Sequence, residues 1–308
     1  MTGLSYVRNE RLFDGRFALV PGPGFGTTRS REDPGLIVGY LEWHRQVDDR
    51  TQILIGPYVG TQSGAGGILL PKFVARRRMG DGATLALLSY PIFQERNADL
   101  RPVETWARPF DIDRLGLDDG GWLMNHELTW QRPGRQGSLF ALTGFYRRAH
   151  RLLLPVVDPD KSGLPSRAFF PRAELMGVEA SYERWLDDRI TGRVFARHQR
   201  TNALQGGAEL PYFPRWEAGV RFDYVDTNGV RGALTLHYVG RRNHIDFVGG
   251  PTTRLGGFVT LDFRVELQLD LRNNLFLEVR DLFDRGPAFY SGYPSNGRTL
   301  LGGVDRRF

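Results

Sequence analysis

The histidines are the residues of this sequence whose chemistry most often serves catalysis or metal binding. There are six of them: His44, His126, His150, His198, His237 and His244. They are scattered, without the short regular spacing typical of zinc ligands. Asn125-His126 could be paired with a distant serine as a nucleophile, but no local motif supports that pair, and a lone histidine on a strand is usually structural. We therefore expect no catalytic residue and no metal site.

The paired acids are better explained by turns than by acid–base chemistry. Asp48-Asp49 and Asp187-Asp188 lie in predicted tight turns, where aspartate is favoured because its side chain bonds to nearby backbone amides. The sequence has no cysteine, which excludes a disulfide framework, a thiolate metal site and a cysteine nucleophile. We expect that the protein is not an enzyme and needs no cofactor.

The positive charge is carried almost entirely by arginine. The formal net charge is +6, and the only lysines are Lys72 and Lys161. Arginine binds phosphate and carboxylate groups through two parallel hydrogen bonds, so an anionic substrate or lipopolysaccharide is a conceivable partner. The alternative is a GC-rich genome that encodes its basic residues as arginine. No basic cluster interleaved with aromatics predicts nucleic-acid binding.

The segment from Val259 to Leu271 shows the clearest regular pattern. Apolar and polar residues alternate over about thirteen positions, which predicts a strand of about 44 Å with one apolar and one polar face. A tilted strand of about ten residues already crosses a bilayer. After a turn at 272–274, a second strand is predicted over 275–283, and a last strand begins at Arg298.

Tight turns and long loops alternate along the rest of the chain. Tight turns are predicted at 47–50, 80–82, 132–135, 187–188 and 226–229, and long loops at 94–120, 151–172, 201–213 and 243–255. This asymmetry is typical of outer-membrane barrels, which have short periplasmic turns and long extracellular loops. The aromatics that suit the two lipid interfaces are Trp43, Trp122, Trp130, Tyr146, Trp185, Trp216 and Tyr238.

The predicted fold is therefore all-β. We expect an antiparallel transmembrane β-barrel of about 14 strands, in a single domain over 1–308 and without a plug domain. Residues 1–35 form an irregular segment with possible strands at 5–13 and 16–20 and a loop at 21–28. The mean hydropathy of −0.36 fits a barrel whose inner face is polar, and no stretch of about eighteen apolar residues could form a transmembrane helix. The first residues show no signal peptide, so the sequence is either a mature chain or a piece of a longer one.

The tail of the sequence carries a family resemblance. It holds Asp281-Leu282-Phe283-Asp284, Tyr290, Tyr293-Pro294, Gly297-Arg298 and a terminal Phe308. These positions resemble the closing hairpin of TonB-dependent outer-membrane receptors, in which the first residue is usually Asn. The resemblance implies these ten residues as a family and assembly signature.

The resemblance also implies a function and partners. Receptors of this family take up substrates such as iron-siderophores across the outer membrane of Gram-negative bacteria, and carry a plug, a TonB-contacting box and 22 strands. The expected partners are outer-membrane lipid, lipopolysaccharide and the barrel assembly machinery, and the TonB complex only if a plug and box lie upstream. The expected C-terminus is periplasmic. The alternatives are a plug-free passive diffusion channel and a non-transporting structural or adhesin-like barrel.

The ligand site is expected in the loops and the lumen wall. The candidates lie near the predicted strand tops or in a long loop, where they could meet an anionic ligand. They are Trp106, Arg147, Arg148, Arg151, Arg241 and Arg242. The arginines could equally pair with lipopolysaccharide phosphates or with nearby acids.

Overall fold

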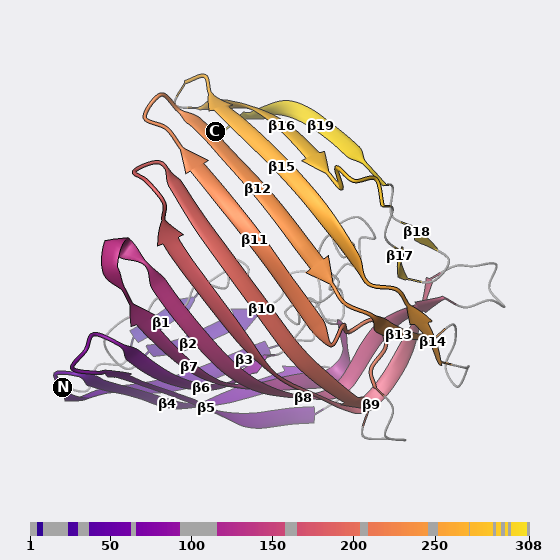
Figure 1. Cartoon of the computed structure of the whole chain (residues 1–308). Helices are drawn as coiled ribbons and strands as arrows, with labels where there is room; N and C mark the ends of the chain where they lie inside the picture. Colours follow the sequence, from indigo (N-terminus) through magenta and orange to yellow (C-terminus); the bar gives the residue numbers. More distant parts are fainter. Residues whose placement is uncertain are drawn as a thin grey trace.

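The computed structural model consists almost entirely of β-strands (Figure 1). It describes residues 5–8, 24–29, 37–62, 66–92, 116–157, 165–203, 209–245, 252–270, 272–285, 288–290, 293–294 and 297–306. Within these ranges the only helical element is a single 3-10 turn, η2 (Arg135–Gly137), between two strands. No helix in the described ranges is long and apolar enough to cross a membrane.

One curved sheet of 15 strands dominates the fold. Its strands, in spatial order, are β1 (Ser5–Arg8), β2 (Gly24–Arg29), β3 (Ile37–Asp48), β4 (Thr51–Gln62), β5 (Gly66–Arg78), β6 (Thr84–Ile92), β7 (Gly116–Pro133), β8 (Leu139–Val157), β9 (Pro165–Trp185), β10 (Ile190–Ala203), β11 (Trp216–Val225), β12 (Val230–Val239), β15 (Phe258–Gln268), β16 (Asn273–Arg280) and β19 (Thr299–Arg306). Every neighbouring pair is antiparallel except β1 and β2, which run parallel. Thirteen of these strands lie from Ile37 onward, and the sheet is close to the predicted size of about 14 strands.

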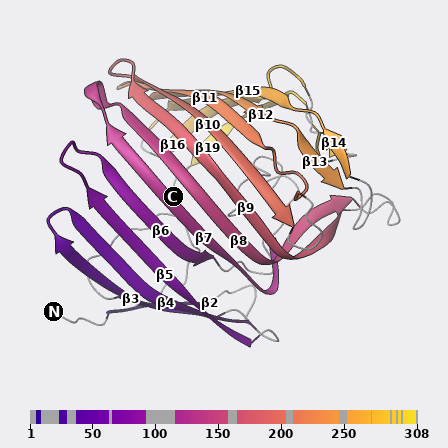
Figure 2. The ribbon, with the colours of Figure 1, turned by 60° about the horizontal axis from the view of Figure 1, so that its bottom comes forward.

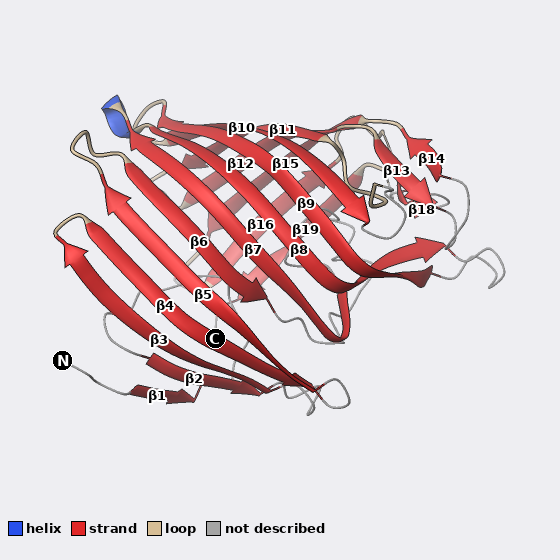
Figure 3. Cartoon of the chain, turned by 90° about the horizontal axis from the view of Figure 1, so that it is seen from below, coloured by secondary structure: helices blue, strands red, loops and turns tan. Residues whose placement is uncertain are grey.

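The sheet curls around an interior, with β1–β2 at one edge and β19 at the other (Figures 1 and 2). In the part of the chain that the structure describes, these two edges do not pair with each other. Short turns gather at one end of the strands, whereas the small hairpins lie at the other (Figure 3). The hairpins are β13 (Arg242–Ile245) with β14 (Thr252–Leu255), and β17 (Ala288–Tyr290) with β18 (Tyr293–Pro294). We call the two ends the turn end and the loop end.

Several predicted loops are wrong because strands extend into them. β2 occupies most of the loop predicted at 21–28, and β7 begins at Gly116 inside the loop predicted at 94–120. β8 and β9 continue as a paired ladder through most of 151–172, and β13 and β14 fill part of 243–255. Outside the apolar band a strand need not alternate apolar and polar residues. Pairing with a neighbouring strand satisfies its backbone hydrogen bonds, whatever its side chains are. The pattern therefore marks the lipid-facing length and misses these extensions.

Other boundaries were predicted too long. β15 ends at Gln268 rather than Leu271, and β16 ends at Arg280 rather than Phe283. β1 covers Ser5–Arg8 of the strand predicted at 5–13, and positions 9–13 lie outside the described residues. The predicted strand at 16–20 lies outside the described residues. At Asp281 the backbone enters a left-handed conformation, with φ of 49°, which ends the strand before Leu282-Phe283. The alternation alone could not reveal that bend.

The two faces of the sheet differ in chemistry. Large apolar side chains on the outer face are highly exposed, for example Leu128 (50%), Val194 (45%) and Phe222 (41%). Exposing one such side chain to water costs about 1.5–3 kcal/mol relative to burying it. Many of them together on one surface indicate a face built for lipid. The inner face carries paired polar residues instead.

The height of the apolar outer face matches the thickness of the apolar layer of a membrane. On the outer face of β9, the polar residues Glu174 and Arg184 flank an apolar stretch that includes Val178 and Tyr182. The stretch between the flanking residues is about 31 Å long at about 3.4 Å per residue. A strand tilt of about 40° reduces this to about 24 Å, close to the apolar band of a transmembrane barrel.

Candidate functional site

The candidate site is the polar inner face of the sheet, where acids and bases from neighbouring strands pair. Arg197 on β10 lies between Glu179 on β9 and Glu217 on β11. Its Nε and Nη2 donate to Oε2 of Glu179 at 2.8 and 2.6 Å, and its Nη1 lies 4.0 Å from Oε2 of Glu217. His237 on β12 lies 3.9 Å from the same carboxylate. Four strands are thus linked by one network.

A second arginine joins this network through an aromatic ring. The Nε of Arg147 donates to Oδ1 of Asn125 at 2.9 Å, and its Nη2 lies 3.3 Å from Oε1 of Glu127. Its Cζ lies 4.7 Å from the centre of the Phe145 ring, and the Cζ of Arg197 lies 6.0 Å from the same ring. Phe145 is therefore flanked by two guanidinium groups, which attract the negative face of the ring.

Two smaller polar clusters lie farther along the wall. On β3–β5, the buried ammonium of Lys72 donates to Oε1 of Glu42 at 2.6 Å and to the Tyr58 hydroxyl at 3.0 Å. On β15–β16, Arg264 pairs with Glu266 and Glu278 at 2.6 and 2.8 Å. Alternating positive and negative groups give the inner face many hydrogen-bond donors and acceptors with little excess of either charge.

An apolar segment covers part of the inner face at the loop end. Leu210 and Phe213 are buried in a cluster with residues of β7–β10, namely Leu123, Ala149, Leu152, Leu154, Ala173, Leu175 and Ala203. The backbone amide of Leu210 donates to Oγ1 of Thr201, and the side chain of Gln199 donates to the carbonyl of Pro214, both at 2.9 Å. Tyr212, with φ of 70°, donates its amide to the carbonyl of Asn243 at 2.7 Å. The segment 209–214 therefore lies against the inner face of β7–β10.

The predicted ligand-binding arginines do not form one group. Arg147 points to the inner face, whereas its neighbour Arg148 is exposed on the outer face because side chains alternate along β8. Arg151 has φ of 60° and lies within β8 rather than in a loop. Arg241 is exposed, whereas Arg242 is 2% exposed and lies 5.0 Å from the Phe258 ring. Trp106 lies outside the described residues.

The signature residues of the tail build the connection from β16 to β19. Leu282 donates its amide to the carbonyl of Leu261 at 2.8 Å, and Asp284, with φ of 54°, donates to the carbonyl of Asp281 at 2.8 Å. Oδ1 of Asp284 accepts the amide of Arg298 at 2.8 Å, next to Gly297 with φ of 65°. Tyr290 lies in β17 and Tyr293 and Pro294 in β18, while Phe308 lies outside the described residues. Phe283 is exposed.

Sequence reasoning missed the acids of the inner network. Glu127, Glu179 and Glu217 lie at the polar positions of strands in which apolar and polar residues alternate. That alternation was the sequence feature that could have placed them on the inner face. It could not show which acid lies beside which arginine, because that depends on the register between strands. In the described ranges, no group of three or more potential ligands is arranged to hold a metal ion.

Together, the apolar outer face, the polar inner face and the two unlike ends define the wall of a transmembrane β-barrel. Residues 123–282 match the profile of the family described as TonB dependent receptor-like, beta-barrel. The chain belongs to this family. No match was found among curated proteins.

Solved structures share the fold. The siderophore receptor PirA from Acinetobacter baumannii has 15% identity and a TM-score of 0.61, over 89% of this chain and 46% of that chain. A variant of the ferric enterobactin receptor PfeA from Pseudomonas aeruginosa has 16% identity and a TM-score of 0.63, over 89% and 45%. The copper transporter OprC has 15% identity and a TM-score of 0.59, over 89% and 48%. The chain thus spans less than half the length of these structures.

Proposed function

We propose that this chain forms barrel wall in an outer-membrane receptor that takes up a substrate in a TonB-dependent manner. The observation that carries the proposal is a sheet with a lipid-matched outer face and a paired polar inner face, in a chain of this family. The similar structures are described as siderophore receptors and a copper transporter. A metal chelate or metal ion is therefore the proposed class of substrate.

The proposed placement puts the turn end and the C-terminus in the periplasm and the loop end outside the cell. In this placement, lipid and lipopolysaccharide surround the wall, and the barrel assembly machinery inserts the protein into the membrane. Energy coupling would come from the TonB complex only if a plug and box lie upstream of this segment. The proposed role is transport, with no catalytic step.

The absence of cysteine makes the placement directly testable. Asn228→Cys places one thiol in a tight turn, and Arg254→Cys places one at the loop end, both at exposed positions. In intact cells, a membrane-impermeant maleimide should label the Arg254→Cys protein and should label the Asn228→Cys protein only after the outer membrane is permeabilised. The reverse pattern would overturn the orientation, and absence from the outer-membrane fraction would overturn the placement.

Substrate uptake needs a second measurement. Cells that lack the protein should lose TonB-dependent accumulation of a radiolabelled ferric siderophore or of copper, and should regain it when the gene is restored. If a plug lies upstream of this segment, the purified receptor in planar bilayers should be nearly silent. Large steady conductance would instead favour passive diffusion, and surface binding with neither uptake nor conductance would favour a structural barrel.

A further inference from the structure

Prolines form a row across neighbouring strands in the interior of the sheet. Pro57 on β4 lies directly opposite Pro71 on β5. The register of β5 against β6, continued by two residues, would place Pro91 opposite Pro71. Proline has no N–H group, and within sheets it is normally confined to edge strands, first residues and bulges. Prolines in the middle of a 15-stranded sheet therefore need an explanation.

The ladder between β4 and β5 shows which way the proline nitrogens point. This ladder runs without a break through Pro57 and Pro71. In an antiparallel ladder, pairs that exchange two N–H···O bonds alternate with pairs that exchange none. Because neither proline can donate, their pair is of the second kind, and their backbone groups point to the strands on the other side. The nitrogen of Pro57 therefore points toward β3, and that of Pro71 points toward β6.

The ladder between β3 and β4 is interrupted where this geometry predicts. Its paired positions reach Trp43 opposite Ile55, skip two residues of each strand, and resume at Tyr40 opposite Tyr58. The skipped residues include Pro57. This interruption is short, and paired residues close it on both sides.

The ladder between β5 and β6 ends, and within the described residues it does not resume. Its last pair is Phe73 opposite Ser89. The next hydrogen-bonded pair would be Pro71 with Pro91, in which both N–H donors would have to be proline nitrogens. Beyond this point β5 continues along β4 as far as Gly66, and β6 continues along β7. Figure 3 shows β5 running past the end of β6 toward the loop end. We call this open boundary between β5 and β6 the seam.

The seam lies in the part of the apolar band that is nearer the loop end. Pro71 is six positions from the exposed Arg77 at the turn end of β5. Six residues span about 20 Å along a strand, or about 16 Å across the membrane at a tilt of about 40°. The apolar band of a transmembrane barrel is about 25 Å tall. Leu69, on the lipid-facing side beside the seam, is 67% exposed.

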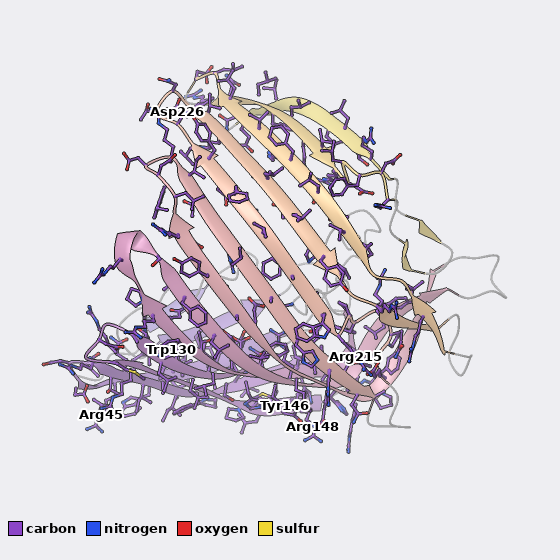
Figure 4. All side chains as sticks on the ribbon, viewed as in Figure 1. Arg45, Trp130, Tyr146, Arg148, Arg215 and Asp226 are labelled. Carbon is purple, nitrogen blue, oxygen red and sulfur yellow. The ribbon has the colours of Figure 1, made fainter. Side chains whose placement is uncertain are left out.

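The neighbouring strands agree with this height. Across β7 and β8, Pro91 is in register with Met124 and then with Arg148. Figure 4 shows Arg148 nearer the loop end and Trp130 nearer the turn end. The seam therefore begins on the loop side of the wall.

The inner side of the seam is polar and aromatic. Lys72, next to Pro71, points inward and donates to Glu42 and to the Tyr58 hydroxyl. Tyr40 stacks on Tyr58 with ring centres 5.1 Å apart and planes inclined by 13°. The seam thus separates an apolar outer face from a polar inner cluster. A molecule that has an alkyl chain and a polar head matches both sides.

We propose that the seam is a lateral portal, through which the alkyl chain of an amphiphile passes between the interior and the surrounding lipid. Unpaired backbone groups are costly in lipid, so an open boundary is unfavourable in a wall that only separates lipid from the interior. The prolines keep the boundary open, and they lower its cost because they leave no N–H without an acceptor there. The proposal rests on the proposed outer-membrane placement. The ligand is a bilayer lipid or a free single-chain amphiphile.

Photo-crosslinking in vesicles tests the portal. The folded protein is reconstituted with a fatty acid or a phosphatidylcholine that carries a diazirine at the end of an alkyl chain, and mass spectrometry locates the labelled residues. The wild type should be labelled at Leu69 on the outer face and at Tyr58 on the inner face. Inner labelling by both probes would identify bilayer lipid as a ligand, and by the fatty acid alone a free amphiphile. Inner labelling by neither probe would overturn the proposal.

Substitution of the prolines tests their role. Pro71→Ala/Pro91→Ala supplies both missing N–H donors, so the ladder should close and inner labelling should fall about tenfold while outer labelling remains. Pro57→Ala is the matched control, because it changes a proline of the same row where the ladder is closed on both sides. It should keep the wild-type inner labelling. Undiminished labelling in the double variant, or an equal loss in the control, would overturn the proposal.

A disulfide test keeps the prolines in place and does not depend on the double variant. The sequence has no cysteine. Val74→Cys/Leu88→Cys places two thiols at facing positions of the intact ladder, where Cβ atoms about 3.5–4.5 Å apart allow a disulfide on mild oxidation. Leu70→Cys/Ile92→Cys places them where the continued register would face them, and should form none. Efficient bonding of this second pair would overturn the proposal. Failure of the outer-membrane placement differs, because outer labelling at Leu69 would then be absent as well.

Discussion

The backbone amide of Asp281 donates a 2.9 Å hydrogen bond to Oδ1 of Asp262 on the neighbouring strand. This bond fixes the point at which β16 ends and the chain turns back toward β19. Asp281 is 6% exposed and has φ of 49°. Asp and Asn adopt this left-handed conformation far more readily than other residues with a side chain. The family preference for Asn here therefore has a conformational basis.

Substitutions at Asp281 test this explanation. Asp281→Asn keeps the left-handed preference and removes one of two adjacent negative charges, so stability should stay the same or rise by about 0.5 kcal/mol. Asp281→Ala loses the preference and should cost about 1–2 kcal/mol. Urea unfolding in detergent micelles measures both. If the alanine variant is as stable as the wild type, the explanation is wrong.

The lipid-facing side should not tolerate charge. Leu234→Arg places a guanidinium within the apolar band and should cost about 2–4 kcal/mol. Thr235, one residue along, points to the inner face opposite Asp262. Thr235→Arg should therefore cost less than about 1 kcal/mol. Unfolding from lipid vesicles measures the difference, and equal costs for the two variants would contradict the assignment of faces.

Arg197 should be important for stability because it joins two acids of the inner face. Glu217 is 5% exposed, so Arg197→Ala removes a cation from beside a buried carboxylate. This change should cost about 2 kcal/mol. The control is Arg193, an exposed arginine on the same face of β10. Arg193→Ala should cost less than about 0.5 kcal/mol. Chemical unfolding compares the two, and equal losses would show that the network has no special role.

Two glycines should respond oppositely to the same change. A Cβ on Gly56 would lie 2.0 Å from the carbonyl oxygen of Leu41, whereas one on Gly144 would meet no atom within 4 Å. Gly56→Ala should therefore cost about 1–3 kcal/mol through steric overlap with the backbone. Gly144→Ala should be neutral or stabilising by about 0.5 kcal/mol, because alanine restricts the unfolded chain. The folded fraction after refolding into detergent measures the effect of both substitutions. A Gly56→Ala variant as stable as the wild type would refute the close approach of residue 56 to the Leu41 carbonyl.

The turn at Asp270 should give a small dependence on pH. The Asn273 side chain, with the amides of Arg272 and Asn273, lowers the pKa of Asp270 below its ordinary value. A lowered folded pKa stabilises the folded state above the unfolded pKa of about 3.9, and this contribution is lost as pH falls through the folded pKa. Asp270→Asn should be slightly less stable at pH about 7 and equal to the wild type at pH about 2. A thermal unfolding difference that persists in acid would contradict this.

The lipid-spanning part of the fold could be predicted because a strand between lipid and a polar interior must alternate apolar and polar residues. The turn predicted at 226–229 is confirmed, between β11 and β12. The extensions of β8 and β9 were missed because no such rule applies outside the bilayer. Arg147 and Arg148 were placed together because adjacency in sequence was the only guide, and alternation puts them on opposite faces.

The network around Arg197 also bears on how the barrel assembles. If β10 slipped by one residue against β9, Arg197 would face hydrocarbon, at about 2–4 kcal/mol for a midplane position. If it slipped by two, the arginine would face inward but no longer lie opposite Glu179. Charge pairing therefore discriminates against the even slips that hydrophobic alternation accepts. The charge pairs of the inner wall therefore favour the correct register between β9 and β10.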